Sequence, residues 1–203
     1  MTQQNIHEML RTQGWYHGEN YSEYDRTELL DGLGKVNMVT QVTPNPASRS
    51  MVTSRKAIGP HTDHHRADYI LWNCLNQSPF GGESILIDSW AILDRMTDQE
   101  KRALESVLLM EHRVFPDDSE RHPMLEKRED GLYRIYYSFW LADKDAPEAF
   151  HRFRSLVEET TPMVIALKPK DILVIDNRRM LHARGAISED STRHLVRYWI
   201  EKK

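Results

Sequence analysis

The last third of the chain alternates short apolar runs with turn sequences, and this pattern restricts the fold more than any other feature. Apolar runs occupy residues 163–167 and 172–176, and a proline-containing turn at 168–171 separates them. A third strand-like run follows at 193–201. Short runs bounded by turn residues predict buried β-strands rather than helices. Because strands and helices do not alternate regularly, we expect a mainly β fold with flanking helices, that is, a β-sandwich or jelly roll.

Strand signals also occur in the first two thirds of the chain. Residues 36–42 alternate weakly between apolar and polar side chains, and residues 69–75 form an almost continuous apolar run. A turn follows, and residues 84–88 form a returning apolar run. We therefore expect these last two runs to pair as a hairpin. The aromatic segment 132–141 is also predicted to be a strand.

Helical spacing of apolar residues appears in three places. Residues 6–33 show it on either side of two glycines. Thr97 and Glu100 match a capping box, in which a hydroxyl and a carboxylate satisfy free backbone N–H groups at a helix start. Asp145 is predicted to cap a further helix. The buried stripe of that helix is predicted to contain Phe150, Phe153 and Val157.

A chain of 203 residues is long enough for one domain with a substantial core and short for two. We therefore expect residues 1–203 to form a single domain, whose N-terminal part, 1–57, contains helix and strand. The polar, charged segment 116–131 is predicted to be a surface loop. It is also a candidate lid, because loops of this kind can close over a reaction.

Charge and cysteine content exclude several classes of partner. The formal net charge is −4 and no basic run occurs, so neither nucleic acid nor an acidic membrane surface is an expected partner. Cys74 is the only cysteine, which prevents an intrachain disulfide. The first residues lack a signal core, and no apolar run is long enough to cross a bilayer. These features fit a cytoplasmic protein that acts on a small molecule, and they leave a homo-oligomer open.

Three polar residues form a candidate metal site. His61 and Asp63 lie two residues apart, so in an extended segment both side chains point to one face. His182 must be brought to them by the fold. Two imidazoles and one carboxylate leave the opposite side of a metal open, and this is the ligand set of non-haem Fe(II) oxygenases. His64 and His65 are alternative ligands on spacing alone, and a polar loop with surface histidines would give the same pattern.

Two arginines extend the candidate site. Arg193 and Arg197 lie four residues apart in a strand-like run, which places both guanidinium groups on one face. Buried charges need partners of opposite charge. Arg193 is therefore a candidate for binding the distal carboxylate of a keto-acid cosubstrate, and Arg197 for binding a second anion, that of the substrate. Structural ion pairs with Asp176 or Glu201 are the alternative.

Four further residues are weaker candidates. Ser84 follows a glycine pair and can present its hydroxyl to the same distal carboxylate as the arginine. Asn73 is a polar residue in an apolar run, and it is either a cosubstrate contact or a hydrogen-bonding group of the core. Trp72 and Tyr137 are candidates for lining a substrate pocket, although aromatic residues in such runs are core residues by default.

Two other functions fit the same residues. Imidazole and carboxylate ligands do not determine which metal binds, so a cupin-like isomerase or lyase that uses zinc or manganese is one alternative. The other is a non-catalytic jelly-roll module that binds a small anion through Arg193 and Arg197. The spectrum of a metal complex would distinguish the first, and stoichiometric iron uptake is not expected of the second.

Three segments of the chain occur in an order that is typical of one enzyme superfamily. They are His-Thr-Asp at 61–63, Gly-Gly-Glu-Ser at 81–84, and the stretch from Asp-Ile-Leu-Val-Ile-Asp to Arg-His-Leu at 171–195. Together they resemble the motifs of the taurine dioxygenase and γ-butyrobetaine hydroxylase superfamily, and the similarity spans about 58–198. The resemblance implies a double-stranded β-helix fold, an Fe(II) cofactor, 2-oxoglutarate as cosubstrate and O2 as oxidant.

The resemblance also assigns roles to individual residues. It implies that the metal ligands are His61, Asp63 and His182. It implies that Arg193, helped by Ser84, binds the distal carboxylate of 2-oxoglutarate. Taurine dioxygenase-like members have a substrate-contacting arginine at the position of Arg197, whereas γ-butyrobetaine hydroxylase-like members differ there.

Two features of the chain refine this picture. Halogenating relatives replace the carboxylate ligand with a small residue, so the presence of Asp63 favours hydroxylation of a small molecule, with release of succinate and CO2. The N-terminal part of this chain is short. Elements that cover the active site in longer relatives are therefore expected to be absent or to come from a partner subunit.

Overall fold

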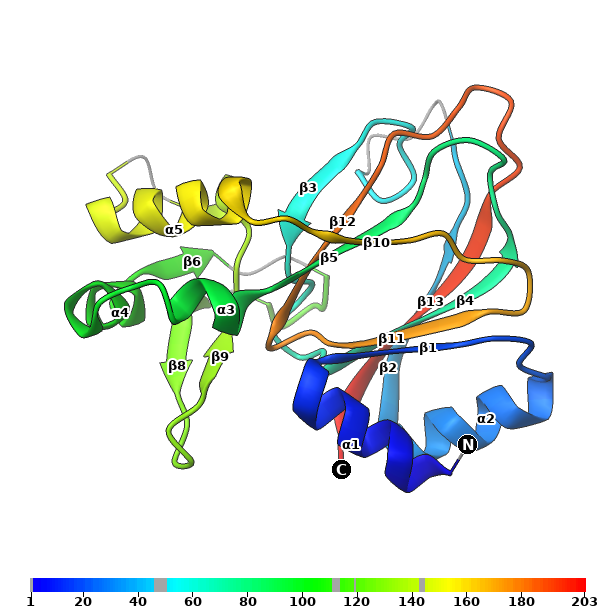
Figure 1. The fold of residues 1–203 in the computed structure, drawn as a ribbon, viewed down its shortest axis with the longest axis horizontal. Coiled ribbons are helices and arrows are strands. Elements are labelled where there is room, and N and C mark those ends of the chain that lie inside the picture. Colours follow the sequence, from blue (N-terminus) through cyan, green and yellow to red (C-terminus); the bar gives the residue numbers. More distant parts are fainter. Residues whose placement is uncertain (1, 46–50, 111–113, 119, 143–144) are drawn as a thin grey trace.

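Two antiparallel β-sheets form the centre of the fold, which the computed structural model describes for residues 2–45, 51–110, 114–118, 120–142 and 145–203. The larger sheet has the strand order β1–β11–β4–β13–β2, and the smaller sheet has the order β10–β5–β12–β3. The sheets lie face to face in Figure 1. From β10 to β13, consecutive strands alternate between the two sheets. This alternation is typical of a double-stranded β-helix, so the predicted fold class is confirmed.

The bounds of the elements are as follows. The strands of the larger sheet are β1 (Trp15–Gly18), β2 (Gly34–Val42), β4 (Tyr69–Asn76), β11 (Ile172–Asp176) and β13 (His194–Lys202). Those of the smaller sheet are β3 (Ile58–His61), β5 (Ser84–Asp88), β10 (Met163–Ile165) and β12 (Met180–Arg184). Two further pairs are β6 (Leu108–Met110) with β7 (Arg121–Pro123), and β8 (Leu125–Lys127) with β9 (Tyr133–Ile135). The helices are α1 (Gln3–Gln13), α2 (Glu23–Leu33), α3 (Ser89–Leu93), α4 (Asp98–Glu105), α5 (Glu148–Glu159) and a 3-10 turn, η1 (Phe139–Leu141).

Apolar side chains from both sheets fill the space between them. Leu173 and Trp199 of the larger sheet pack there with Leu86 and Met180 of the smaller sheet. Side chains in a strand alternate between its two faces, so each strand contributes every second residue to this layer. The candidate functional residues of the inner faces are therefore held by a packed core.

Helices α1 and α2 cover the outer face of the larger sheet (Figure 1). Leu10 of α1 and Leu33 of α2 are buried against Leu71 of β4. Gly14 ends α1 with a φ of 83°, a left-handed conformation that favours glycine. The helical spacing in residues 6–33 is thus confirmed for two helices, with the unpredicted strand β1 between them.

Helices α3, α4 and α5 lie beside the sheets with β8 and β9 (Figure 1). The predicted stripe of α5 is confirmed, because Phe150, Phe153 and Val157 are all buried. The predicted cap is wrong, since the residue before this helix is Pro147 and not Asp145. The fixed φ of proline is compatible with a helix start, and Pro147 makes no side-chain hydrogen bond to the first turn.

Replacing Phe153 with alanine tests this helix packing. The Phe153 side chain is fully buried, and its ring centroid lies 5.1 Å from that of Tyr137. We expect Phe153→Ala to lower the free energy of unfolding by about 3–5 kcal/mol in urea denaturation, because it leaves a cavity. Ser155→Ala, on the exposed side of the same helix, is the control and should stay within about 0.5 kcal/mol of the wild type. A Phe153→Ala loss below about 1 kcal/mol would contradict the packing.

Two further secondary-structure predictions can be compared directly. The capping box at Thr97 and Glu100 is confirmed at the start of α4, where each side chain accepts a backbone N–H of the other residue. The predicted hairpin of β4 and β5 is wrong, because the two strands belong to different sheets. β4 pairs with β11 and β13, whereas β5 pairs with β10 and β12. A turn between two apolar runs can lead to either sheet of a sandwich, and the local sequence does not distinguish the two.

In the middle of the chain, one segment contains more strand than predicted and another contains less. Segment 116–131, of which residue 119 lies outside the described part, contains β7 and β8 rather than only a surface loop. Met124 between these strands is fully buried. In segment 132–141, only Tyr133–Ile135 is a strand, and the 3-10 turn η1 follows. No helix among the described residues is both long and apolar enough to cross a membrane.

Candidate metal centre

Strand pairing brings the two candidate histidine ligands together. His61 of β3 and His182 of β12 are direct partners in neighbouring antiparallel strands, and their ring centroids lie 4.2 Å apart. The chain leaves β3 after His61, and Asp63 follows in the irregular segment 62–64. Its Oδ1 atom lies 3.6 Å from Nε2 of each histidine. Within the described residues, this is the one group of three such side chains whose ligand atoms all lie within 4.8 Å of one another.

The two alternative histidines have other neighbours. Nε2 of His64 lies 3.0 Å from Oδ2 of the buried Asp118. The ring of His65 stacks on that of His122, with centroids 3.6 Å apart. Neither imidazole therefore belongs to the group around Asp63.

The electrostatics of the group suit metal binding. Burial, together with the nearby His61, lowers the pKa of His182 to about 4, so its imidazole is neutral at pH 7. Burial acts to raise the pKa of the Asp63 carboxyl, but the charge of Arg197 and the contacts with His182 outweigh it and hold this pKa well below its usual range. A neutral His182 imidazole and an ionised Asp63 carboxylate are the protonation states in which these side chains can bind a divalent metal.

Hydrogen bonds to the backbone orient these side chains. Nδ1 of His61 donates to the carbonyl of Gly59 at 2.9 Å, which leaves its Nε2 lone pair directed toward the group. The backbone N–H of Asp63 donates to Oδ1 of Asn177 at 2.8 Å. The amide of Asn177 in turn donates to the carbonyl of Ala67 at 2.8 Å. Asn177 therefore has a structural role, because it fixes the segment that carries Asp63.

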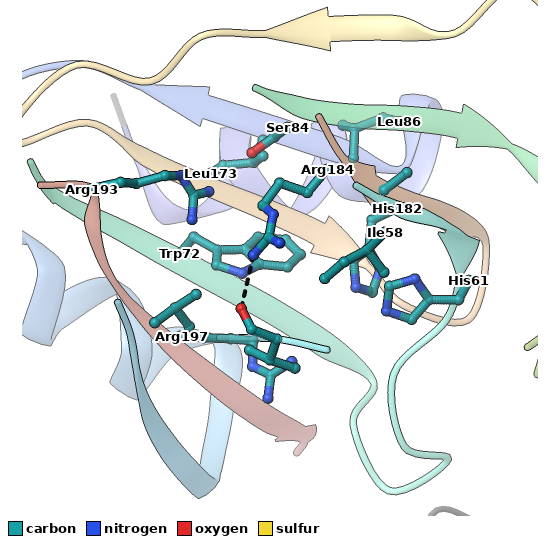
Figure 2. A pocket seen from close by; sticks show the side chains of 13 residues that line it. Ile58, His61, Trp72, Ser84, Leu86, Leu173, His182, Arg184, Arg193 and Arg197 are labelled. Atoms are coloured by element: carbon teal, nitrogen blue, oxygen red, sulfur yellow. Dashed lines mark hydrogen bonds between the residues drawn. The ribbon is translucent and has the colours of Figure 1, made fainter. Parts of the chain in front are cut away.

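An inner cavity runs from the two histidines into the space between the sheets. Figure 2 shows His61 and His182 side by side at one end, Arg193 and Ser84 at the other, and the Trp72 ring between them. The edge of Trp72 packs against the His182 ring at a centroid distance of 5.1 Å. The cavity thus connects the candidate metal ligands with a buried cation.

Arg193 is a buried guanidinium that lacks a counter-ion. The residue is 3% exposed, its Nε donates to Oε1 of Gln77 at 3.0 Å, and its buried Nη1 has no hydrogen-bond partner. Within the described part of the chain, no carboxylate forms an ion pair with it. Burial lowers its pKa to about 10, so it remains charged at pH 7. A carboxylate of a bound molecule would supply the missing partner.

Gly82 makes room for this arginine. It adopts a φ of 76°, and a Cβ at this position would lie 2.9 Å from Cδ of Arg193. Any other residue would therefore be strained and would displace the guanidinium. Ser84 begins β5 beside it and lines the same cavity, so the structure brings Ser84 and Arg193 together as predicted.

An outer cavity of about 340 Å³ adjoins the metal group on the other side. Its polar lining is His61, Asp63 and Arg197, and the rest is aromatic or aliphatic. The aromatic and aliphatic residues are Met51, Val52, Ile58, Val114, Trp140 and Trp199. A small molecule fits a cavity of this size and character. Arg197 lines both cavities and therefore lies where they meet.

Arg197 is paired with a carboxylate that the sequence did not indicate. Its Nη1 donates to Oδ2 of Asp63 at 2.8 Å, rather than to Asp176 or Glu201. The indole N–H of Trp199 donates to the same oxygen at 2.7 Å. The side chain that was expected to meet a substrate anion is thus also in contact with a candidate metal ligand.

Two candidate residues are not brought to the cavities. Asn73 is buried on β4, but strand alternation places it on the opposite face from Trp72, with Leu71, toward α1 and α2. The Tyr137 ring packs between Phe150 and Phe153, and its backbone carbonyl instead accepts the N–H of Thr62 at 2.7 Å. Trp72 lines the inner cavity and not the outer one.

Three further residues lie at the site, and none of them was among the site residues predicted from the sequence. Arg184, two residues after His182 on β12, donates to the carbonyls of Val52, Ser54 and Lys56 at 2.6 to 2.8 Å. Trp199 follows Arg197 by two residues, and Trp140 lies in η1 with its ring centroid 5.2 Å from that of His61. The two-residue spacing on a strand was the available signal for Arg184 and Trp199.

Comparison with known structures agrees with this architecture. The fold matches an asparagine oxygenase in complex with Fe(II), 3-hydroxyasparagine and succinate, with a TM-score of 0.79 and 16% identity over 98% of this chain and 78% of that chain. It matches the non-haem iron oxygenase OrfP with Fe and α-ketoglutaric acid, with a TM-score of 0.77 and 16% identity over 99% and 79%. It matches PvcB from Pseudomonas aeruginosa, with a TM-score of 0.71 and 15% identity over 98% and 80%.

Sequence comparisons identify the family. A search of curated protein sequences found no significant match. The family model described as taurine catabolism dioxygenase TauD, TfdA family, however, matches residues 13–199, which is most of the chain. That span includes both histidines, the carboxylate and the buried arginine of the site. The protein therefore belongs to the TauD/TfdA dioxygenase family and is a 2-oxoglutarate-dependent non-haem iron dioxygenase.

Proposed function

We propose that this dioxygenase hydroxylates a C–H bond of a small, amino-acid-like molecule that binds in the outer cavity, with release of succinate and CO2. One observation carries the proposal. The two cavities meet at the group of His61, Asp63 and His182, and the inner one ends at a buried guanidinium that has no counter-ion. The family accounts for the enzyme class, and neither a zinc or manganese isomerase nor a non-catalytic module is needed to explain the site.

The proposal gives six side chains of the site a role. His61, Asp63 and His182 would hold Fe(II), which in this enzyme class activates O2 at the expense of 2-oxoglutarate. Arg193 and Ser84 would bind the distal carboxylate and so orient the keto acid toward the iron. Trp72, packed on His182, would keep water away from the space between Arg193 and the metal ligands.

The substrate class follows from the outer cavity and from what similar folds bind. Arg197, at the junction of the cavities, offers a cation to an anionic group of the substrate, and the apolar lining suits its carbon skeleton. The asparagine oxygenase and OrfP are described in complexes with 3-hydroxyasparagine and 3-hydroxyarginine. Both are hydroxylated amino acids, which supports an amino-acid-like substrate here.

A substrate screen tests the proposal. We expect at least one member of a panel of L-amino acids and their N-acyl or sulfonate analogues to accelerate succinate formation from 2-oxoglutarate by about tenfold or more over the uncoupled rate, because a correctly bound substrate completes the site. Mass spectrometry should then detect a product 16 Da heavier, the mass of one added oxygen. Succinate formation that no amino acid or anionic analogue stimulates would contradict the substrate class.

A further inference from the structure

One oxygen of Asp63 is held by two donors from the same strand. Arg197 and Trp199 lie two residues apart on β13, so both side chains point to the inner face of the sheet. Nη1 of Arg197 and Nε1 of Trp199 donate to Oδ2 at 2.8 and 2.7 Å. The other oxygen, Oδ1, faces the two imidazoles at 3.6 Å from each Nε2, which is longer than a hydrogen bond. The two carboxylate oxygens therefore have different environments.

We propose that Trp199 is a positioning residue for the metal: its indole N–H, with Arg197, holds Oδ2 so that Asp63 offers only Oδ1 to iron. This inference rests on the proposed role of Asp63 as a ligand. A carboxylate that bound through both oxygens would occupy a coordination position that the cosubstrates need. Two strong hydrogen bonds to Oδ2 oppose that binding mode, because it would require the oxygen to turn away from both donors.

Trp199 is suited to this role in a way that Arg197 is not. The indole has a single polar atom, a donor, and that atom is committed to Asp63. Arg197 has further donors, and its Nε is buried without a hydrogen-bond partner, so it can also meet an anionic ligand. The Trp199 ring is stacked against His64 at a centroid distance of 5.6 Å and is 5% exposed, which restricts its motion. Among the described residues, Asp63 is the one acceptor that this indole N–H contacts.

The test removes the N–H and keeps an aromatic ring. We expect Trp199→Phe to weaken Fe(II) binding about 10- to 100-fold, measured by anaerobic calorimetry on the metal-free protein, because Oδ1 of Asp63 is then held less firmly toward the two imidazoles. The absorption spectrum of the Co(II)-substituted variant should also show a changed coordination number. Trp90→Phe is the matched control, since it removes an indole N–H bond of 2.8 Å to the Tyr133 carbonyl, away from the iron site, and should leave Fe(II) affinity unchanged.

The outcomes separate this inference from the proposed function. Fe(II) affinity within twofold of the wild type in Trp199→Phe, together with loss of binding in His182→Ala, would overturn the inference and leave the metal site intact. Wild-type affinity in His182→Ala would instead overturn the metal site itself. If metal-free Trp199→Phe unfolds at a lower temperature than the wild type, Trp199→Met supplies a second variant without the N–H, and the same loss of affinity is expected.

Discussion

His182→Ala is expected to abolish 2-oxoglutarate-dependent succinate formation, with a decrease of more than about 100-fold. Loss of a contact that only supports a ligand can reduce metal affinity or activity by up to about this factor, and loss of the ligand itself should exceed it. The imidazole of His182 is buried, neutral and 3.6 Å from the Asp63 carboxylate, so no neighbouring side chain among the described residues can replace it in the group. Succinate should be measured with saturating Fe(II) and ascorbate.

A surface histidine provides the control for this variant. His151 lies on the exposed side of α5, and His151→Ala should retain the wild-type rate. Iron bound per chain should fall in His182→Ala and stay unchanged in His151→Ala. Wild-type turnover in a folded His182→Ala protein would show that the three side chains do not form the metal site.

The residue types of the site could be predicted from the sequence, because their chemistry is specific. The spacing of His61 and Asp63 predicts one shared face, and a buried guanidinium such as Arg193 predicts an anion. Neither argument requires the fold. The pairing of β3 with β12, which places His61 opposite His182, does require it. Both strands are short, and both were missed.

Strand periodicity explains the errors as well. Alternation predicts that neighbouring residues such as Trp72 and Asn73 face opposite sides, but it does not say which side is the inside. The sequence therefore left Asn73 with two alternatives, a cosubstrate contact or a core hydrogen bond, whereas Trp72 is the residue that lines the cavity. The same rule, started from residues already known to face inward, would have identified Arg184 from His182 and Trp199 from Arg197. Once one residue of a strand is known to be a ligand, alternation shows which other residues of that strand face the same side.

Arg193→Met is expected to raise the KM for 2-oxoglutarate about 30-fold or more. Removing one partner of a buried, hydrogen-bonded charge pair costs about 2–5 kcal/mol, and each 1.4 kcal/mol is about a factor of ten in affinity. In the complex, the distal carboxylate would lose its cation while it is still enclosed by the cavity. The KM should be obtained from succinate formation at fixed substrate, or from the absorption of the anaerobic Fe(II)–2-oxoglutarate complex.

Two variants separate the charge of Arg193 from its geometry. Arg193→Lys keeps a cation but loses the planar, two-pronged donor, so its KM should lie between those of the wild type and Arg193→Met. Arg95→Met removes a half-exposed arginine that pairs with Glu159 on the surface, and its KM should be unchanged. An unaltered KM in Arg193→Met would mean that the keto acid does not reach this end of the inner cavity. In that case Arg184, another buried guanidinium that lines the inner cavity, would be the next residue to replace.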